Sequence, residues 1–155
     1  FCYKIWVLKK RMTNERLILS TVQERSKDKK TALPEMKVSG LLDNLLSYLE
    51  HEKPYLNPKL SIGDVALKLS CTETELSQLL NNHMNVNFAN FINVYRVNEI
   101  KKRLNQENLS KYTLKALSEQ CGFSSKATFY RVFKNVTGMT PLEYCKKQNL
   151  VIKEN

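Results

Sequence analysis

Tyr112 to Tyr144 read YTLKALSEQCGFSSKATFYRVFKNVTGMTPLEY, and an earlier stretch follows the same plan. That stretch, from Leu60 to Phe91, reads LSIGDVALKLSCTETELSQLLNNHMNVNFANF. The apolar residues of the two copies align at an offset of 52, and at an offset of 53 after one extra residue enters the second copy. Each copy predicts a short helix, a tight turn, a second short helix and a turn into a third. Two copies are too few for a solenoid, so we predict a module of two lobes.

The composition favours an all-α protein. The chain has 155 residues, 42% of them hydrophobic, which is enough for a modest core. Only four glycines occur, against six helical segments that we read without glycine. Cys71, Cys121 and Cys145 occupy apolar positions of the repeat, and the cysteines show no metal-binding spacing. We therefore expect a reducing compartment and no metal or cofactor.

The charge of the chain is unevenly distributed. A formal net charge of +10 suits a polyanionic partner such as DNA. Residues 61–90 carry one lysine against three carboxylates, a net charge of −2, whereas residues 112–155 carry seven cations against three carboxylates, a net charge of +4. We therefore expect the second copy to provide most of the affinity for DNA.

Two capping boxes define the helices of the first copy. Ser61 with Asp64, and Thr72 with Glu75, pair an N-cap hydroxyl with an acid three residues later. We predict that the second helix runs from about residue 73 to residue 82 and buries three leucines. Its outward residues are then Glu73, Thr74, Ser77, Gln78 and Asn81.

The second copy has the same layout. We expect Thr113 to cap a helix that ends near Cys121, and Gly122 to form the turn. Ser124 is expected to cap the second helix, from about residue 125 to residue 136, with Phe129, Val132 and Phe133 facing inward. The outward residues are Lys126, Ala127, Tyr130, Arg131 and Lys134.

A longer helix is predicted between the two copies, from Asn87 to Leu104. At roughly 17 residues it would measure about 26 Å. Its apolar residues are placed to pack on both lobes, so it would fix the separation of the two second helices. A separation near one DNA turn, about 34 Å, would put both in successive major grooves. Arg96 lies among apolar neighbours, and we expect it to bond a specific partner.

The outward side chains of the two second helices carry groups suited to reading bases. The major groove admits one helix, and residues near its N-terminus reach the base edges. Arg131 suits a bidentate contact with guanine, Lys126 a contact with guanine or phosphate, and Gln78 a contact with adenine. Glu73 and Glu75 would repel phosphates, so we interpret them as first-turn and capping residues, with a cytosine contact as the alternative.

The start of the chain differs from the rest. Residues 1–11, FCYKIWVLKKR, place three aromatic residues just ahead of three basic ones. This pattern is typical of the cytoplasmic end of a transmembrane helix, and equally of an ordinary amphipathic helix. Residues 5–22 fill five of six a/d heptad positions with apolar side chains, which predicts a coiled coil that makes a homodimer.

A linker and a further helix are predicted ahead of the repeat. Residues 26–37 are charged and contain Pro34, so we read a linker, and a helix follows from about Gly40 to Glu52. We therefore divide the chain into residues 1–37, a juxtamembrane or dimerising helix with its linker, and residues 38–153, a double helix-turn-helix domain.

Residues 122–144, GFSSKATFYRVFKNVTGMTPLEY, closely resemble the signature of the AraC/XylS family of bacterial transcription regulators. Residues 60–97 are similar to that family's first helix-turn-helix and linker helix, and the resemblance covers about residues 40–148. It implies seven helices in two lobes joined by a long helix, sequence-specific binding to promoter DNA, and recruitment of RNA polymerase. Residues 52–61 resemble members whose sensing half is membrane-embedded or receptor-like, which implies a cytoplasmic domain with an inner-membrane anchor upstream of Phe1.

The resemblance also assigns base-reading positions. They fall on Thr74, Ser77 and Gln78 in the first unit, and on Lys126, Ala127, Tyr130 and Arg131 in the second, beside which we count Lys134. This chain departs from the family pattern at Thr74 and Gln78, where many members place an aromatic or basic residue. Asn85 stands where the family usually has glycine, a change that left-handed backbone geometry tolerates.

Two classes of function remain open on the sequence. The first is the DNA-binding output domain of a signal-responsive transcription regulator, either tethered to a membrane or soluble with a dimerising start. The second is a protein-interaction module that kept the fold and lost DNA binding through Glu73 and Glu75. An enzyme is not expected, because the sequence has no cluster of nucleophile and base, no phosphate-binding glycine loop and no set of metal ligands.

Overall fold

The computed structural model describes residues 35–152, and all of its regular structure in that range is helical. The α-helices are α2 (Glu35–His51), α3 (Ile62–Lys68), α4 (Glu73–Gln78), α5 (Phe88–Arg103), α6 (Gln106–Lys111), α7 (Leu114–Gln120), α8 (Lys126–Thr137) and α9 (Pro141–Lys147). A 3₁₀ helix, η1 (Pro54–Leu56), joins α2 to α3, and a π-helical segment, η2 (Leu79–His83), extends α4. The predicted all-α class is confirmed.

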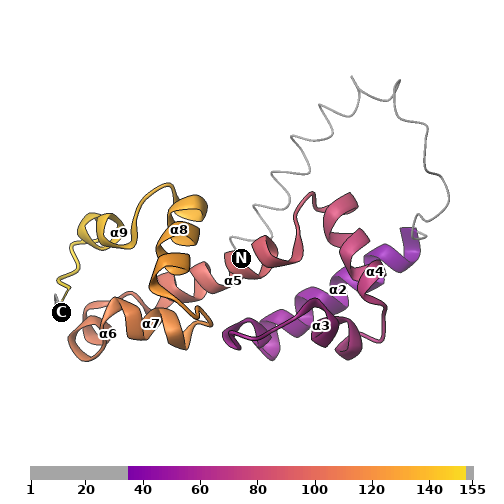
Figure 1. The fold of residues 1–155 in the computed structure, drawn as a ribbon, viewed down its shortest axis with the longest axis horizontal. Coiled ribbons are helices and arrows are strands. Elements are labelled where there is room, and N and C mark those ends of the chain that lie inside the picture. The colour runs from indigo at the N-terminus through magenta and orange to yellow at the C-terminus, as the bar shows by residue number, and fades with distance from the viewer. Residues whose placement is uncertain (1–34, 153–155) are drawn as a thin grey trace, which may run out of the picture.

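The helices form two lobes, each with its own core (Figure 1). The first lobe holds α2, η1, α3, α4 and η2, and buries residues such as Leu45, Leu49 and Leu76. The second lobe holds α6 to α9, with Phe129 and Phe133 buried at its centre. The lobes contain the two copies of the repeat, so the predicted two-lobed module is confirmed.

Helix α5 is shared between the lobes. Phe91 and Ile92, near its N-terminus, belong to the first core. Val97 and Ile100, two turns further along, belong to the second core. Burying both ends of one helix in different cores fixes the separation of the lobes, as the sequence predicted.

The capping predictions hold with one shift. The Ser61–Asp64 and Thr72–Glu75 capping boxes are both present, and Thr113 caps α7. The cap of α8 is Ser125 rather than Ser124, because the Ser125 hydroxyl accepts the Thr128 amide at 3.2 Å. The helix therefore begins at residue 126, one position later than expected.

The second helix of the first unit is not α-helical throughout. We predicted one helix from residue 73 to residue 82, whereas α4 ends at Gln78 and the chain continues as a π-helical segment to His83. Asn85 then adopts left-handed geometry, with φ of 50°, and the Val86 amide bonds back to the Leu80 carbonyl. The amide of Met84 donates to the same Leu80 carbonyl. The widened, π-helical end of the segment is therefore closed by two hydrogen bonds to one oxygen. The expectation that asparagine would take the left-handed turn is confirmed.

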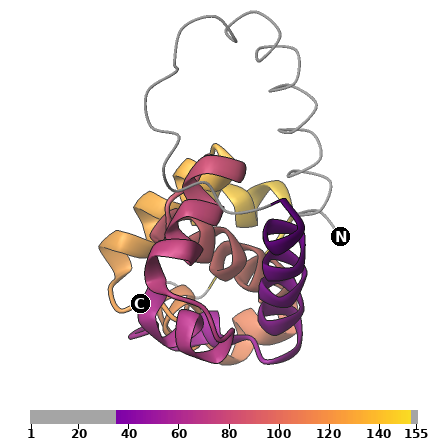
Figure 2. The same ribbon diagram turned by 90° about the vertical axis from the view of Figure 1, so that its right-hand side faces the viewer.

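Two helices differ from the prediction made from the sequence. Helix α2 begins at Glu35, so residues 35–37 are helical instead of part of a linker, and it lies along one edge of the molecule (Figure 2). Helix α6 was not read from the apolar pattern, because its six residues bury only Leu109; the Asn105 side chain caps it.

The predicted membrane-proximal start and the coiled coil of residues 5–22 lie outside the described residues. Among residues 35–152, no helix has the length and apolar character needed to cross a membrane.

Candidate nucleic-acid interface

Helix α8 presents the most basic surface of the two units. Its inward side, with Phe129, Val132 and Phe133, is buried in the second core. The opposite side carries the predicted contact residues, and four of these five side chains are exposed to solvent. They are Lys126, Ala127, Arg131 and Lys134, whereas Tyr130 is half-buried. The structure thus brings all five predicted residues of the second unit onto one face.

Tyr130 supports the position of Lys126. The Lys126 Nζ lies 5.6 Å from the centre of the Tyr130 ring, within the range of a cation–π contact. The ring itself packs edge-on against Phe129, with centroids 5.3 Å apart. Burial against the second core raises the pKa of Tyr130 above its ordinary value. Tyr130 therefore offers a hydroxyl and a ring edge beside a cation.

The first unit offers a polar and less accessible face. Thr74 is exposed, but Ser77 and Gln78 are half-buried. The Ser77 hydroxyl accepts a hydrogen bond from the Asn81 amide at 3.0 Å, so part of its capacity is already used within the helix. The predicted residues share one face of α4, yet they carry no positive charge.

Glu75 is a structural residue of α4. One of its oxygens accepts the Thr72 amide at 2.9 Å, which completes the capping box. The other pairs with the Lys37 ammonium group of α2. These bonds, first from Lys37 and then from Thr72, lower the pKa of Glu75 to about 2. The capping interpretation of Glu75 is confirmed.

Arg96 holds the two lobes together near the middle of α5. Its Nε donates to the Tyr55 carbonyl at 2.8 Å, and its Nη2 donates to the Asn57 carbonyl at 2.9 Å. The guanidinium carbon lies 5.9 Å from the centre of the Phe123 ring, which belongs to the second core. The specific bonding expected of Arg96 is confirmed, and its partners are backbone carbonyls that no sequence motif marks.

A buried carboxylate lies one turn further along α5. Glu99 is 5% exposed, and one of its oxygens accepts two bonds from Arg103, at 3.1 and 3.0 Å. The Lys53 ammonium lies 3.6 Å from the other oxygen. Burial alone would raise the pKa of Glu99, but the Arg103 bonds and the Lys53 charge outweigh it, so this pKa is lowered. The network ties the chain before η1 to the second half of α5.

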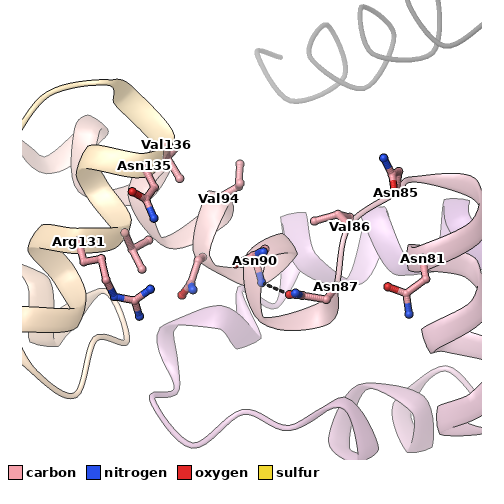
Figure 3. A pocket seen from close by; sticks show the side chains of 11 residues that line it. Asn81, Asn85, Val86, Asn87, Asn90, Val94, Arg131, Asn135 and Val136 are labelled. Atoms are coloured by element: carbon pink, nitrogen blue, oxygen red, sulfur yellow. Dashed lines mark hydrogen bonds between the residues drawn. The ribbon is translucent and has the colours of Figure 1, made fainter. Parts of the chain in front are cut away.

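A groove of about 480 Å³ lies between α8 and the segment that runs from η2 into the first half of α5 (Figure 3). Seven of its eleven lining side chains are polar, namely Arg131 and six asparagines. The asparagines are Asn81, Asn85, Asn87, Asn90, Asn93 and Asn135. Except for Arg131, our sequence reading assigned no function to these residues. The composition of the sequence could have identified this segment, because residues 81–93 contain six asparagines in 13 positions.

Comparisons with known proteins agree with this architecture. A family model described as a helix-turn-helix domain matches residues 53–147, which span both units and α5. The chain belongs to the AraC/XylS type of helix-turn-helix family.

Relatives of this family differ greatly in length. The chain is 29% identical over 104 residues to the xylose operon regulatory protein of Haemophilus influenzae, covering 67% of this chain and 25% of that protein. It is 24% identical over 117 residues to an uncharacterised HTH-type transcriptional regulator, YtdP, of Bacillus subtilis, covering 76% of this chain and 14% of that protein. The chain thus spans a quarter or less of the length of these curated relatives.

A solved structure shows the same fold. The DNA-binding domain of AdpA, a global transcriptional factor crystallised with a target DNA, has a TM-score of 0.56 at 17% identity, covering 70% of this chain and 92% of that one. The family match and the curated transcription-regulator relatives identify the chain as a DNA-binding domain of the transcription-regulator type rather than an enzyme.

Proposed function

We propose that this AraC/XylS-type domain binds promoter DNA sequence-specifically, with α4 and α8 in successive major grooves. The observation that carries the proposal is the cationic outward face of α8, with Arg131 at its centre, on a helix whose opposite side is buried. Helices α4 and α8 stand on either side of the middle of α5, and the Arg96 bonds hold that junction (Figure 1). A rigid pair of readers supports recognition of two DNA segments at a fixed spacing.

Each outward residue of α8 has a role that fits its chemistry. Arg131 makes a bidentate contact with guanine, and Ala127 meets a thymine methyl group. Lys126, held over the Tyr130 ring, contacts guanine or a phosphate, and Lys134 contacts a phosphate. The Tyr130 hydroxyl donates a hydrogen bond to the DNA backbone.

The reader in the first unit contributes less affinity. Gln78 is suited to adenine, whereas Thr74 and Ser77 offer hydroxyl groups to either kind of base or to phosphate. These side chains are neutral, and two of the three are half-buried. Since phosphate contacts dominate affinity, α8 supplies most of the binding free energy and α4 adds specificity.

We also propose that the domain is the cytoplasmic output end of a longer, signal-responsive regulator. The small share of the two curated relatives that it covers supports further segments in the whole protein. RNA polymerase is the expected partner on the promoter. The proposal also includes a homodimer through residues 5–22 and an inner-membrane anchor upstream of Phe1. Both are supported by the aromatic, basic and heptad pattern of residues 1–22.

The test is selection of bound duplexes from a random-sequence pool, followed by titration of the selected duplex at several salt concentrations. We expect enrichment of two short blocks about 10 base pairs apart, and affinity that falls steeply with salt. Recovery of no preferred sequence, or a flat response to salt, would contradict the proposal and favour a protein-interaction module.

The interaction-module alternative has lost part of its support. It rested on Glu73 and Glu75 as acidic residues that repel phosphates. In the structure, the Glu75 carboxylate accepts the Thr72 amide and pairs with the Lys37 ammonium group of α2. One of the two acids is therefore paired within the fold, which leaves Glu73 as the remaining support for this alternative and the selection experiment as its test.

A further inference from the structure

The groove between α8 and the segment from η2 into α5 has a lining unlike that of a small-molecule pocket. Such pockets are lined mainly by apolar and aromatic side chains. Here seven of the eleven lining side chains are polar, the remaining four are valines, and no aromatic residue of the described part of the chain takes part. The groove therefore favours a ligand that makes many hydrogen bonds.

The charge of the lining narrows the ligand further. Among residues 35–152, Arg131 is the one charged side chain that lines the groove, and no carboxylate does. An asparagine amide offers two N–H donors as well as a carbonyl acceptor. A surface rich in N–H donors, with one positive charge and no negative charge, suits an anion that is spread out, such as a phosphodiester strand.

Several of these amides have no bond to another part of the fold. Asn87 accepts the Asn90 backbone amide at 2.8 Å as the cap of α5, and Asn81 donates to Ser77. Within residues 35–152, the side-chain amides of Asn90, Asn93 and Asn135 make no hydrogen bond. Figure 3 shows Asn135 and Arg131 projecting from α8 toward the space bordered by Asn90. Their hydrogen-bonding capacity is therefore available to a ligand.

The location of the groove indicates which ligand it binds. Asn81 lies on η2, which continues α4, and Arg131 lies on the outward face of α8, so the groove lies between the end of the first unit and the second reader. If the readers occupy successive major grooves, the DNA between them presents its minor groove and the two phosphate strands that flank it. Proteins read the minor groove with an inserted arm or wedge. A concave surface instead receives a protruding strand.

We infer that this groove binds the phosphodiester strand that crosses between the two major-groove sites, through the amides of Asn90, Asn93 and Asn135. The inference rests on the proposed function and adds a third contact region to it. Neutral amides fix the register of the two readers on the duplex without releasing counterions, so this contact depends little on salt. The asparagine-rich stretch at the junction of the repeat then has a function of its own.

The experiment uses the duplex that the wild-type protein selects from a random pool. Asn90→Asp and Asn135→Asp are nearly isosteric and place a negative charge in the groove. An acid at residue 90, in the first turn of α5, favours the helix, so folding is preserved. The matched control is Asn44→Asp, which adds the same charge at an exposed position of α2 away from the groove lining.

We expect each groove variant to bind the selected duplex about tenfold more weakly than wild type, with the Asn44→Asp protein unchanged. Ethylation of the phosphates between the two selected blocks should block wild-type binding. In an Asn90→Ala/Asn135→Ala protein the same ethylation should have less effect, because the contact is already missing.

Two results would overturn the inference while leaving the proposed function intact. One is wild-type affinity in both groove variants together with insensitivity to ethylation of the central phosphates. The other is a loss of preference at central base pairs only, which would mean that the asparagines read the minor groove. If the wild-type protein selects no duplex at all, the proposed function fails as well.

Discussion

Gly122 lies directly against the carbonyl oxygen of Tyr55: a methyl group on Gly122 would come within 2.3 Å of that oxygen and 2.8 Å of the Arg96 Nε. The backbone of Gly122 also has φ of 87°, a region that residues with a side chain rarely adopt. The turn between α7 and α8 therefore fits against η1 only when residue 122 has no Cβ. This contact brings the turn of the second unit against the first lobe.

We predict that Gly122→Ala lowers the free energy of unfolding by more than about 2 kcal/mol, because left-handed strain and a collision with rigid backbone add together. Urea denaturation followed by circular dichroism measures the change. Gly138→Ala is the matched control, since Gly138 has φ of 82° but no atom of residues 35–152 lies within 4 Å of its added Cβ. Its expected cost is about 1 kcal/mol, and equal losses in the two variants would contradict the close contact at Gly122.

Arg96 provides a second prediction at the same junction. Arg96→Met keeps much of the packing but removes both donors to the Tyr55 and Asn57 carbonyls. We expect a loss of about 1 to 3 kcal/mol in the free energy of unfolding, since a charged donor is lost and two carbonyls lose their partner. Lys102→Met, at an exposed position of the same helix, is the control. Equal free energies of unfolding in the two variants would show that the Arg96 bonds do not stabilise the junction of the lobes.

The sequence predicted the parts of this fold that local chemistry specifies. The capping boxes at Ser61 and Thr72 follow from hydroxyl and acid spacing, and the inward face of α8 follows from its apolar period. The partners of Arg96 could not be predicted, because backbone carbonyls are present at every residue and only folding selects two of them. Helix α6 was missed because a six-residue helix with one buried leucine shows no period.

The candidate site was likewise predictable only in part. The outward residues of α8 share one face because residues three and four apart lie side by side on a helix. The groove between the lobes is different, since it joins Asn90 and Asn93 of α5 to Asn135 of α8, more than 40 residues apart in sequence. Only the packing of both lobes on α5 brings these side chains together.

The ion pair of Glu75 predicts a pH dependence of stability. Its pKa is lowered to about 2 in the folded protein, below the ordinary value of 4.5. A carboxylate with a lowered folded-state pKa contributes its stability fully above the unfolded value and loses it as the pH falls toward the folded value. We therefore expect Glu75→Gln to be less stable than wild type at pH 7, with the difference shrinking from about pH 4.5 down to pH 2.

Thermal unfolding of both proteins between pH 7 and pH 2 measures this difference. Glu73→Gln is the control, because it removes the same charge from the first turn of α4 without touching the Thr72 capping box. Lys37→Met should reproduce part of the Glu75→Gln effect at pH 7, since it removes the other half of the pair. A constant difference between wild type and Glu75→Gln across the whole range would contradict the role of the carboxylate.

The final prediction separates base contacts from phosphate contacts on α8. Arg131→Ala should weaken binding to the selected duplex by about 1 to 3 kcal/mol and relax the preference at one base pair, as loss of a bidentate guanine contact requires. Lys126→Ala should weaken binding to all duplexes alike and reduce the salt slope by about one, if Lys126 contacts a phosphate. Gln78→Ala, on the weaker first reader, should alter preference at one position with a smaller loss of affinity. Competition titrations against single-base variants of the selected duplex distinguish the three, and an Arg131→Ala protein with unchanged preference at every position would remove Arg131 from the set of base-reading residues.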